Sequence, residues 1–164
     1  MPSLTLSLDD LWAWTEEERA KWEAWFPAHP EALEFVLRGD KFGTVGGLVG
    51  HSFEAEWRQA HRFGGGPVPD RKDPAGLGIP ELFDYGRRAR AFFRAEAAKM
   101  SAAAWDETIA FQTASGPVTL TKRKLALHLP LHEIRHWAQI ARTVREHDLA
   151  PPGRHDFAFS DAVE

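Results

Sequence analysis

The sequence contains no cysteine, which excludes disulfide bonds, zinc–thiolate clusters, iron–sulfur ligation and a cysteine nucleophile. Any thiol chemistry would therefore need a thiol supplied from outside the chain. No apolar run approaches the ~20 residues that a membrane-spanning helix needs. The first ten residues have neither the basic start nor the long apolar core of a signal peptide. These absences lead us to expect a cytoplasmic protein with no membrane partner.

Positive charge is not in excess either, because 20 Lys and Arg face 24 Asp and Glu, for a formal net charge of −4. Binding to nucleic acid normally needs a basic surface, so we expect no nucleic-acid partner. What the chain does have is an ordinary hydrophobic fraction of 43% and seven Trp. Disordered chains are poor in aromatic residues. We therefore expect residues 1–164 to form a single globular domain.

Hydrophobic periodicity predicts four long helices, with a short one between the first two. They are expected at about residues 8–26, 30–37, 45–63, from Pro80 onward, and 122–146. For the first helix, Ser7 and Thr15 are both candidate caps, and Thr15 with the acidic residues behind it is the stronger capping box. Pro130 lies inside the last helix and removes one backbone hydrogen bond, so we expect a kink there.

Two segments depart from the helical pattern. Residues 108–121 carry β-favouring side chains on both sides of Ala114-Ser115-Gly116, which predicts a short hairpin. Residues 64–78 are rich in Gly and Pro and predict a loop of about fifteen residues, long enough for a lid or a mobile linker. Long helices, one crossover and a small hairpin favour an all-α fold, an antiparallel four-helix bundle with the hairpin before the last long helix.

Three glycines, Gly46, Gly47 and Gly50, stand at the start of the second predicted helix. Each costs about 1 kcal/mol of helix propensity relative to Ala. Either a neighbouring helix or a ligand approaches the backbone closely at this point, or the helix is frayed and starts late. The sequence leaves both readings open.

Eight histidines are many for this length, and two of them share a helix face. His132 and His136 are four residues apart, a spacing that lets two neutral imidazoles bind one divalent transition metal. His128 extends the same stripe by one turn. His51, among small and apolar residues of the second predicted helix, is placed to supply a third ligand across a bundle, where such sites are assembled. The alternative is that these are core or surface imidazoles that hold no metal.

The other histidines are expected away from this group. His29, His147 and His155 lie near helix ends or in the tail, which predicts surface positions. His61 falls on a different helix face from His51, because ten residues correspond to about 280° of helix rotation.

The sequence resembles the DinB/YfiT-like group of metal-binding four-helix bundles over nearly its whole length. The resemblance rests on three stretches, Gly50 to Glu56, Leu127 to Ile140, and Pro151 to Phe157. It implies one divalent metal, commonly nickel or zinc, and a homodimer. The implied metal ligands are His51, His132 and His136.

Three neutral ligands leave a divalent metal its full charge and at least one open position, as in catalytic sites. Such a metal can lower the pKa of bound water to about 7 or hold a thiol as thiolate. The resemblance implies an enzyme that transfers a low-molecular-weight thiol, such as bacillithiol, mycothiol or glutathione, to small electrophiles. Glu54, Glu56 and Glu133 are candidates for proton transfer or for supporting the ligands, although a solvated helix face is the commoner place for each of them.

Two alternatives remain. The string His132-Glu133-x-x-His136 matches a zinc peptidase helix, in which Glu133 would be the general base. Its metzincin continuation fails, however, because Gln139 and Arg142 stand where that pattern needs other residues. The second alternative is a non-catalytic, stress-induced bundle that holds a metal and binds a ligand or partner.

Overall fold

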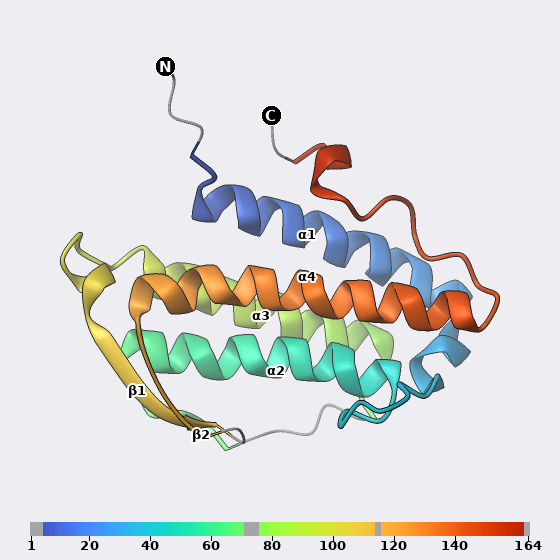
Figure 1. The fold of residues 1–164 in the computed structure, drawn as a ribbon, viewed down its shortest axis with the longest axis horizontal. Coiled ribbons are helices and arrows are strands. Elements are labelled where there is room, and N and C mark those ends of the chain that lie inside the picture. Colours follow the sequence, from blue (N-terminus) through green and yellow to red (C-terminus); the bar gives the residue numbers. More distant parts are fainter. Residues whose placement is uncertain (1–4, 71–75, 114–115, 163–164) are drawn as a thin grey trace.

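The computed structural model describes residues 5–70, 76–113 and 116–162. Four helices pack side by side, and a two-stranded hairpin lies across one end of them (Figure 1). The predicted all-α bundle, with the hairpin before the last long helix, is confirmed. Among the described residues, no helix is long and apolar enough to cross a bilayer. The elements are α1 (Leu8–Trp25), α2 (Val45–Gly64), α3 (Ile79–Ala97), β1 (Thr108–Thr113), β2 (Gly116–Thr121) and α4 (Lys122–Glu146).

The helices form two pairs of opposite direction. Phe53 in the first half of α2 packs on Phe83 near the start of α3, with ring centroids 5.5 Å apart. Phe63 and Phe93, toward the ends of the same helices, lie 5.0 Å apart. Thus α2 and α3 run the same way, and α1 and α4 run the opposite way (Figure 1).

This topology explains the long Gly/Pro-rich loop. Because α2 and α3 are parallel, the chain must return along the bundle between Gly64 and Ile79, so this connection is the predicted crossover. Its first residue, Gly65, has φ of 73° and ends α2 in the left-handed conformation that suits glycine. Residues 71–75 lie outside the described residues, so a lid or mobile linker stays a prediction.

The start of α1 differs from the preferred prediction. Ser7 caps the helix, since its Oγ accepts from the amide of Asp10 at 3.0 Å and the Asp10 carboxylate accepts from the Ser7 amide at 2.8 Å. Thr15 instead lies fully buried inside the helix, with its hydroxyl donating to the carbonyl of Leu11 at 3.0 Å. The stronger-looking capping box was wrong because a Thr can satisfy its hydroxyl on the preceding helical turn and need not end the helix.

The short segment before α2 ends earlier than predicted. It is a 3-10 helix over Pro30–Glu34 and does not reach Leu37. Val36 pairs with Thr44 in an isolated antiparallel bridge, and the Leu37 amide donates to the Gly43 carbonyl at 2.8 Å. The chain therefore turns back on itself just before α2 begins.

The glycines at the start of α2 meet this preceding segment. A Cβ on Gly47 would lie 2.3 Å from the Phe42 carbonyl oxygen, and one on Gly46 would lie 3.2 Å from that of Leu33. Close backbone approach is thus the correct reading, with a loop as the neighbour, and the frayed, late-starting helix is wrong. α4 is one helix from Lys122 to Glu146 with Pro130 inside it, so Pro130 does not end the helix, and the expected kink stays a prediction.

Two apolar clusters fill the bundle, one toward each end. The first centres on Trp22, Phe53, Phe83 and Trp137, and the second on Trp12, Phe63, Phe93 and Leu125. The tryptophans among them are nearly or fully buried, so the seven Trp largely serve the core.

Candidate metal centre

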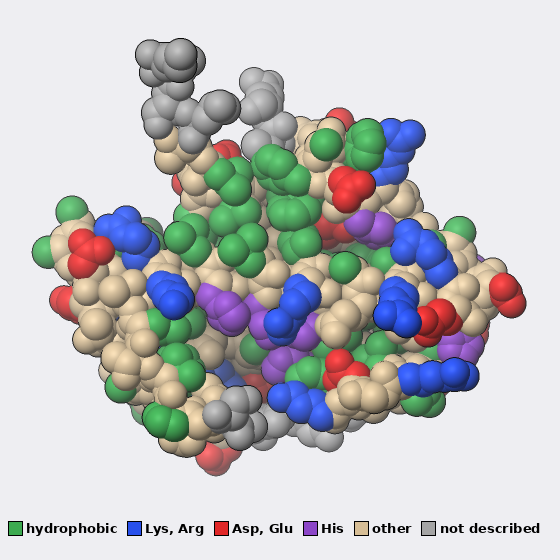
Figure 2. All heavy atoms as spheres, in the orientation of Figure 1, with side chains coloured by type: hydrophobic (Ala, Val, Ile, Leu, Met, Phe, Trp, Pro, Cys, Tyr) green, Lys and Arg blue, Asp and Glu red, His purple; other side chains and the backbone are tan. Residues whose placement is uncertain are grey.

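Three histidines from two helices converge between α2 and α4. His51 comes from α2, and His132 and His136 come from successive turns of α4. One ring nitrogen of each lies within 4.8 Å of the others, and the Nε2 atoms of His132 and His136 are 3.1 Å apart. The prediction that these residues meet is confirmed. Figure 2 shows histidine side chains gathered at the surface over α2 and α4, so solvent reaches the group.

The donor set and its spacing fit a divalent transition metal. Imidazole nitrogens bind zinc at about 2.0–2.1 Å, which places neighbouring ligand atoms about 3.4 Å apart in a tetrahedral site. The 3.1 Å separation between the two α4 nitrogens is close to that value. The His51 ring lies 5.4 Å and 5.3 Å from its two partners, centroid to centroid, and one of its nitrogens lies within 4.8 Å of theirs. These three residues could hold a metal ion with at least one position left open.

Gln139 fixes the orientation of one ligand. Its Oε1 lies 2.6 Å from Nδ1 of His136. Since the amide oxygen can only accept, Nδ1 carries the proton and Nε2 is left with its lone pair directed toward His132. The sequence analysis did not single out Gln139, although its position three residues after a predicted ligand was the available signal.

Phe42 holds the third histidine from the side. Its ring stacks on His51 with centroids 3.9 Å apart and planes 20° apart, and its edge faces His136 at 6.0 Å. The close approach of Phe42 to Gly47 brings this ring over α2. Periodicity could not have identified Phe42, because it lies in the turn before the helix.

Burial keeps the α4 imidazoles neutral. Desolvation, followed by the neighbouring histidines and Arg135, lowers the pKa of His132 to about 3. Desolvation also lowers the pKa of His136 and of His128. Neutral rings are the form that binds metal, so no proton has to be displaced from these two ligands at neutral pH. His128 stands one turn away, with its ring 5.2 Å from that of His132, and is not among the three converging residues.

The remaining histidines have separate surroundings. His147 is exposed, as predicted, and stacks on Phe35 at 3.8 Å. His61 packs on Phe92 at 4.6 Å, apart from His51, again as predicted. His29 is half-buried against Trp25 rather than free on the surface.

His155 was predicted to lie at the surface, but in the structure it packs against α1. Its Nδ1 lies 2.6 Å from Oε2 of Glu18, a buried residue of α1, and its ring stacks on Trp22 at 5.5 Å. The tail that follows α4 thus folds back on α1, which sequence spacing alone did not reveal.

The three candidate glutamates are not on a solvated face. Glu54, Glu56 and Glu133 are each only 3% exposed. Two of them, Glu56 and Glu133, face the bundle interior and pair there with Arg19 and Arg90. The expectation of a solvated face was wrong for Glu56 and Glu133 because the arginines that compensate them come from α1 and α3, far away in sequence.

The four charges form one closed network, with one residue from each helix. Arg19 donates to Glu133 through Nε at 2.5 Å and pairs with Glu56, and Arg90 reaches Glu133 at 3.0 Å and also pairs with Glu56. Trp137 donates its indole N–H to Glu133 at 3.0 Å. Both oxygens of Glu133 are therefore engaged in the core, which does not favour a proton-transfer role at the histidines.

Within this network, Glu56 and Arg19 stabilise each other's charged forms. Burial by itself opposes ionisation of Glu56, but the charges of Arg19 and Arg90 and their hydrogen bonds outweigh it and hold the pKa of Glu56 below 4.5. The same carboxylates raise the pKa of Arg19 despite its burial. Glu56 and Arg19 are therefore a charged pair at neutral pH.

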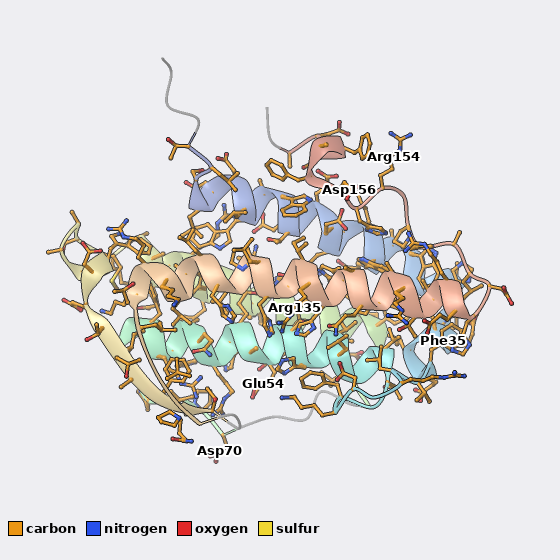
Figure 3. The ribbon with its side chains drawn as sticks, viewed as in Figure 1. Phe35, Glu54, Asp70, Arg135, Arg154 and Asp156 are labelled. Carbon is orange, nitrogen blue, oxygen red and sulfur yellow. The ribbon has the colours of Figure 1, made fainter. Side chains whose placement is uncertain are left out.

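A cavity of about 400 Å³ adjoins the histidines. It lies between α2, the turn before it and strand β1, with His51 at one end, and Glu54 lies along the edge of α2 in Figure 3. This is space for a small molecule beside His51. Its lining residues include Lys41, Phe42, His51, Glu54, Arg58, Arg62 and Phe111.

Comparison with known protein families gives one match. The model described as the DinB superfamily matches residues 14–140, a range that contains all three converging histidines. No curated protein matches the chain.

Proposed function

Because the chain belongs to the DinB superfamily, we propose that it is a metal-dependent enzyme that transfers a low-molecular-weight thiol to small electrophiles. His51, His132 and His136 hold one divalent transition metal. The observation that carries the proposal is the convergence of three imidazoles, within 4.8 Å of one another, beside a cavity that can admit a small molecule.

Each residue of the site has a definite task. The three histidines supply the ligand nitrogens, those of His132 and His136 on neutral rings, and Gln139 keeps His136 in the tautomer whose Nε2 is free to bind. A divalent metal in this place supplies Lewis acidity, which lowers the pKa of a thiol so that it reacts as thiolate at neutral pH. The thiolate sulfur then bonds to the electrophilic carbon, the leaving group departs with its electron pair, and the thiol proton passes to solvent. The absence of cysteine fits a reaction whose thiol comes from outside.

Zinc and nickel are the metals that we propose for the site. Imidazole suits both ions, and availability in the cell commonly decides between them.

The peptidase alternative finds little support in the geometry. A general base must reach the water that it activates, whereas the Glu133 carboxylate is held by Arg19, Arg90 and Trp137. The non-catalytic bundle is the outcome that remains if no reaction is found.

The test is a transfer assay with purified, metal-loaded protein. Monochlorobimane serves as electrophile, and glutathione, bacillithiol and mycothiol are supplied in turn. We expect acceleration with at least one thiol, its loss in His132→Ala, and its retention in His147→Ala, which removes an exposed ring outside the site. Equal rates for wild type and His132→Ala with all three thiols would overturn thiol transfer, and cleavage of casein lost in Glu133→Gln would favour the peptidase.

A further inference from the structure

The cavity beside the histidines extends along one face of α2. His51, Glu54, Arg58 and Arg62 line it at three- and four-residue intervals, which is the spacing of one helix face. The eleven residue steps of helix from His51 to Arg62 span about 16 Å. Phe111 of strand β1 lines the cavity beside Arg62. A ligand with one end at the histidines can therefore reach the hairpin with its other end.

The described lining of this cavity is predominantly basic. Lys41, Arg58 and Arg62 contribute three positive charges, and Glu54 is the one acidic side chain among the described lining residues. Arg58 lies 3.8 Å from Glu54, nitrogen to oxygen. Among the described residues, no carboxylate forms an ion pair with Lys41 or Arg62. By contrast, Arg88 on the exposed side of α3 pairs with Asp84 at 2.9 Å.

Two contacts hold the Arg62 guanidinium in place. Its guanidinium lies over the Phe111 ring, 4.6 Å from the centroid, and one nitrogen donates to Oε1 of Gln59 at 3.2 Å. Burial and the charge of Arg58 lower the pKa of Arg62, so an anion placed between the two arginines would relieve their repulsion. A planar guanidinium fixed on an aromatic ring matches a carboxylate through two parallel hydrogen bonds.

We propose that this cavity recognises the carboxylates of an anionic small thiol through Lys41, Arg58 and Arg62, with the sulfur end of the ligand directed toward His51. The inference rests on the proposed function and narrows its substrate class. It selects a thiol with two carboxylates, such as glutathione or bacillithiol, over mycothiol, whose sugar and inositol end carries no carboxylate. Glu54 lies on the same face as Arg58, where its carboxylate can accept a hydrogen bond from an ammonium group of such a ligand.

The test separates carboxylate recognition from thiol chemistry. S-methylglutathione keeps both carboxylates but cannot form a thiolate, so its binding to metal-loaded protein reports on the cavity alone. By isothermal titration calorimetry we expect it to bind, to weaken as NaCl is raised, and to lose about tenfold or more in affinity in Arg62→Gln, because a hydrogen-bonded charge partner is removed. Lys41→Gln should weaken binding in the same direction. The matched control Arg88→Gln should bind as wild type does.

The outcomes distinguish the two proposals. Arg62-dependent binding of S-methylglutathione, with no transfer of any thiol, supports the inference and overturns the proposed reaction. Transfer of mycothiol at a rate that Arg62→Gln leaves unchanged overturns the inference and supports the reaction. Equal affinity of wild type, Arg62→Gln and Lys41→Gln for S-methylglutathione, at equal metal content and helicity, also overturns the inference.

Discussion

Gly47 shows how one missing side chain positions a metal ligand. Its bare Cα lets the Phe42 carbonyl approach to a point only 2.3 Å from where a Cβ would stand, and the Phe42 ring then stacks on His51. The glycine lowers helix propensity by about 1 kcal/mol, so its presence in the first turn of α2 is explained by this contact rather than by the helix.

Gly47→Ala should therefore destabilise the protein despite the gain in helix propensity. Forcing the Phe42 backbone away costs about 1–3 kcal/mol, as overpacking does, and frees the ring that holds His51. We expect a lower melting temperature and weaker zinc binding. Gly46→Ala is the graded control, because its Cβ would meet Leu33 at the milder distance of 3.2 Å. A more stable Gly47→Ala protein with unchanged zinc affinity would contradict this role.

Gln139 acts on the metal through His136. Removing an outer hydrogen-bond partner of a ligating histidine typically costs 10–100-fold in metal affinity. We expect Gln139→Ala to lose about that much zinc affinity in competition with a chromogenic chelator, with little change in helicity. Gln139→Glu, whose carboxylate also accepts from Nδ1–H, should recover most of it. Equal zinc affinities of Gln139→Ala and wild type would show that Gln139 does not support the metal ligand His136.

At the scale of the helices, the charged network separates the two apolar clusters of the bundle. On α2, Glu56 stands between Phe53 of one cluster and Ala60 of the other. On α4, Glu133 stands likewise between Leu129 and Trp137. A polar layer of this kind is satisfied in only one alignment of the four helices, so we infer that it fixes their register.

Acid should weaken the charged network. The folded-state pKa of Glu56 lies below its ordinary value of 4.5, so its contribution to stability is present above that pH and is lost as pH falls through the folded-state pKa. We expect Glu56→Gln to be less stable than wild type by about 3–5 kcal/mol at pH 7, because it leaves buried arginine charge uncompensated. The difference should narrow toward pH 3 in urea unfolding curves, and a difference independent of pH would contradict the assigned ionisation.

Some features of the fold and the site were predictable from the sequence, and others were not. The spacing of His132 and His136 placed two rings on one helix face, and the family resemblance implied His51 as the third ligand. The structure confirms that the three rings converge. The charged network was not predictable, since nothing in the sequence around Glu56 or Glu133 shows that an arginine from another helix pairs with either glutamate. The same limit hid the Phe42 stacking and the His155 contact, which depend on how segments without periodicity fold back.

At the scale of the whole molecule, one face of α4 carries apolar side chains that the described residues leave uncovered. Leu127 and Leu131, one turn apart, are 36% and 52% exposed, and Figure 2 shows hydrophobic side chains gathered over α1 and α4. Two exposed leucines on adjacent turns of one helix offer apolar surface that a partner can cover.

We expect a second copy of the chain to cover this face, which gives the homodimer implied by the family resemblance. Light scattering coupled to size exclusion should give twice the chain mass of 18.5 kDa. Leu131→Glu should shift the protein toward the monomer, whereas Arg142→Glu, a change at an exposed α4 position farther along the helix, should not. A wild-type protein that elutes as a monomer at high micromolar concentration would refute the dimer.

The central claim is that three imidazoles, distant along the chain, share one divalent cation. The most direct measurement is the metal content of His51→Ala by inductively coupled plasma mass spectrometry, after loading with zinc or nickel and desalting, beside wild type and His147→Ala. We predict about one metal per chain in wild type and in His147→Ala, and a large loss in His51→Ala with helicity retained. A His51→Ala protein that keeps one metal per chain would contradict the account, because the α2 imidazole would then not be a ligand.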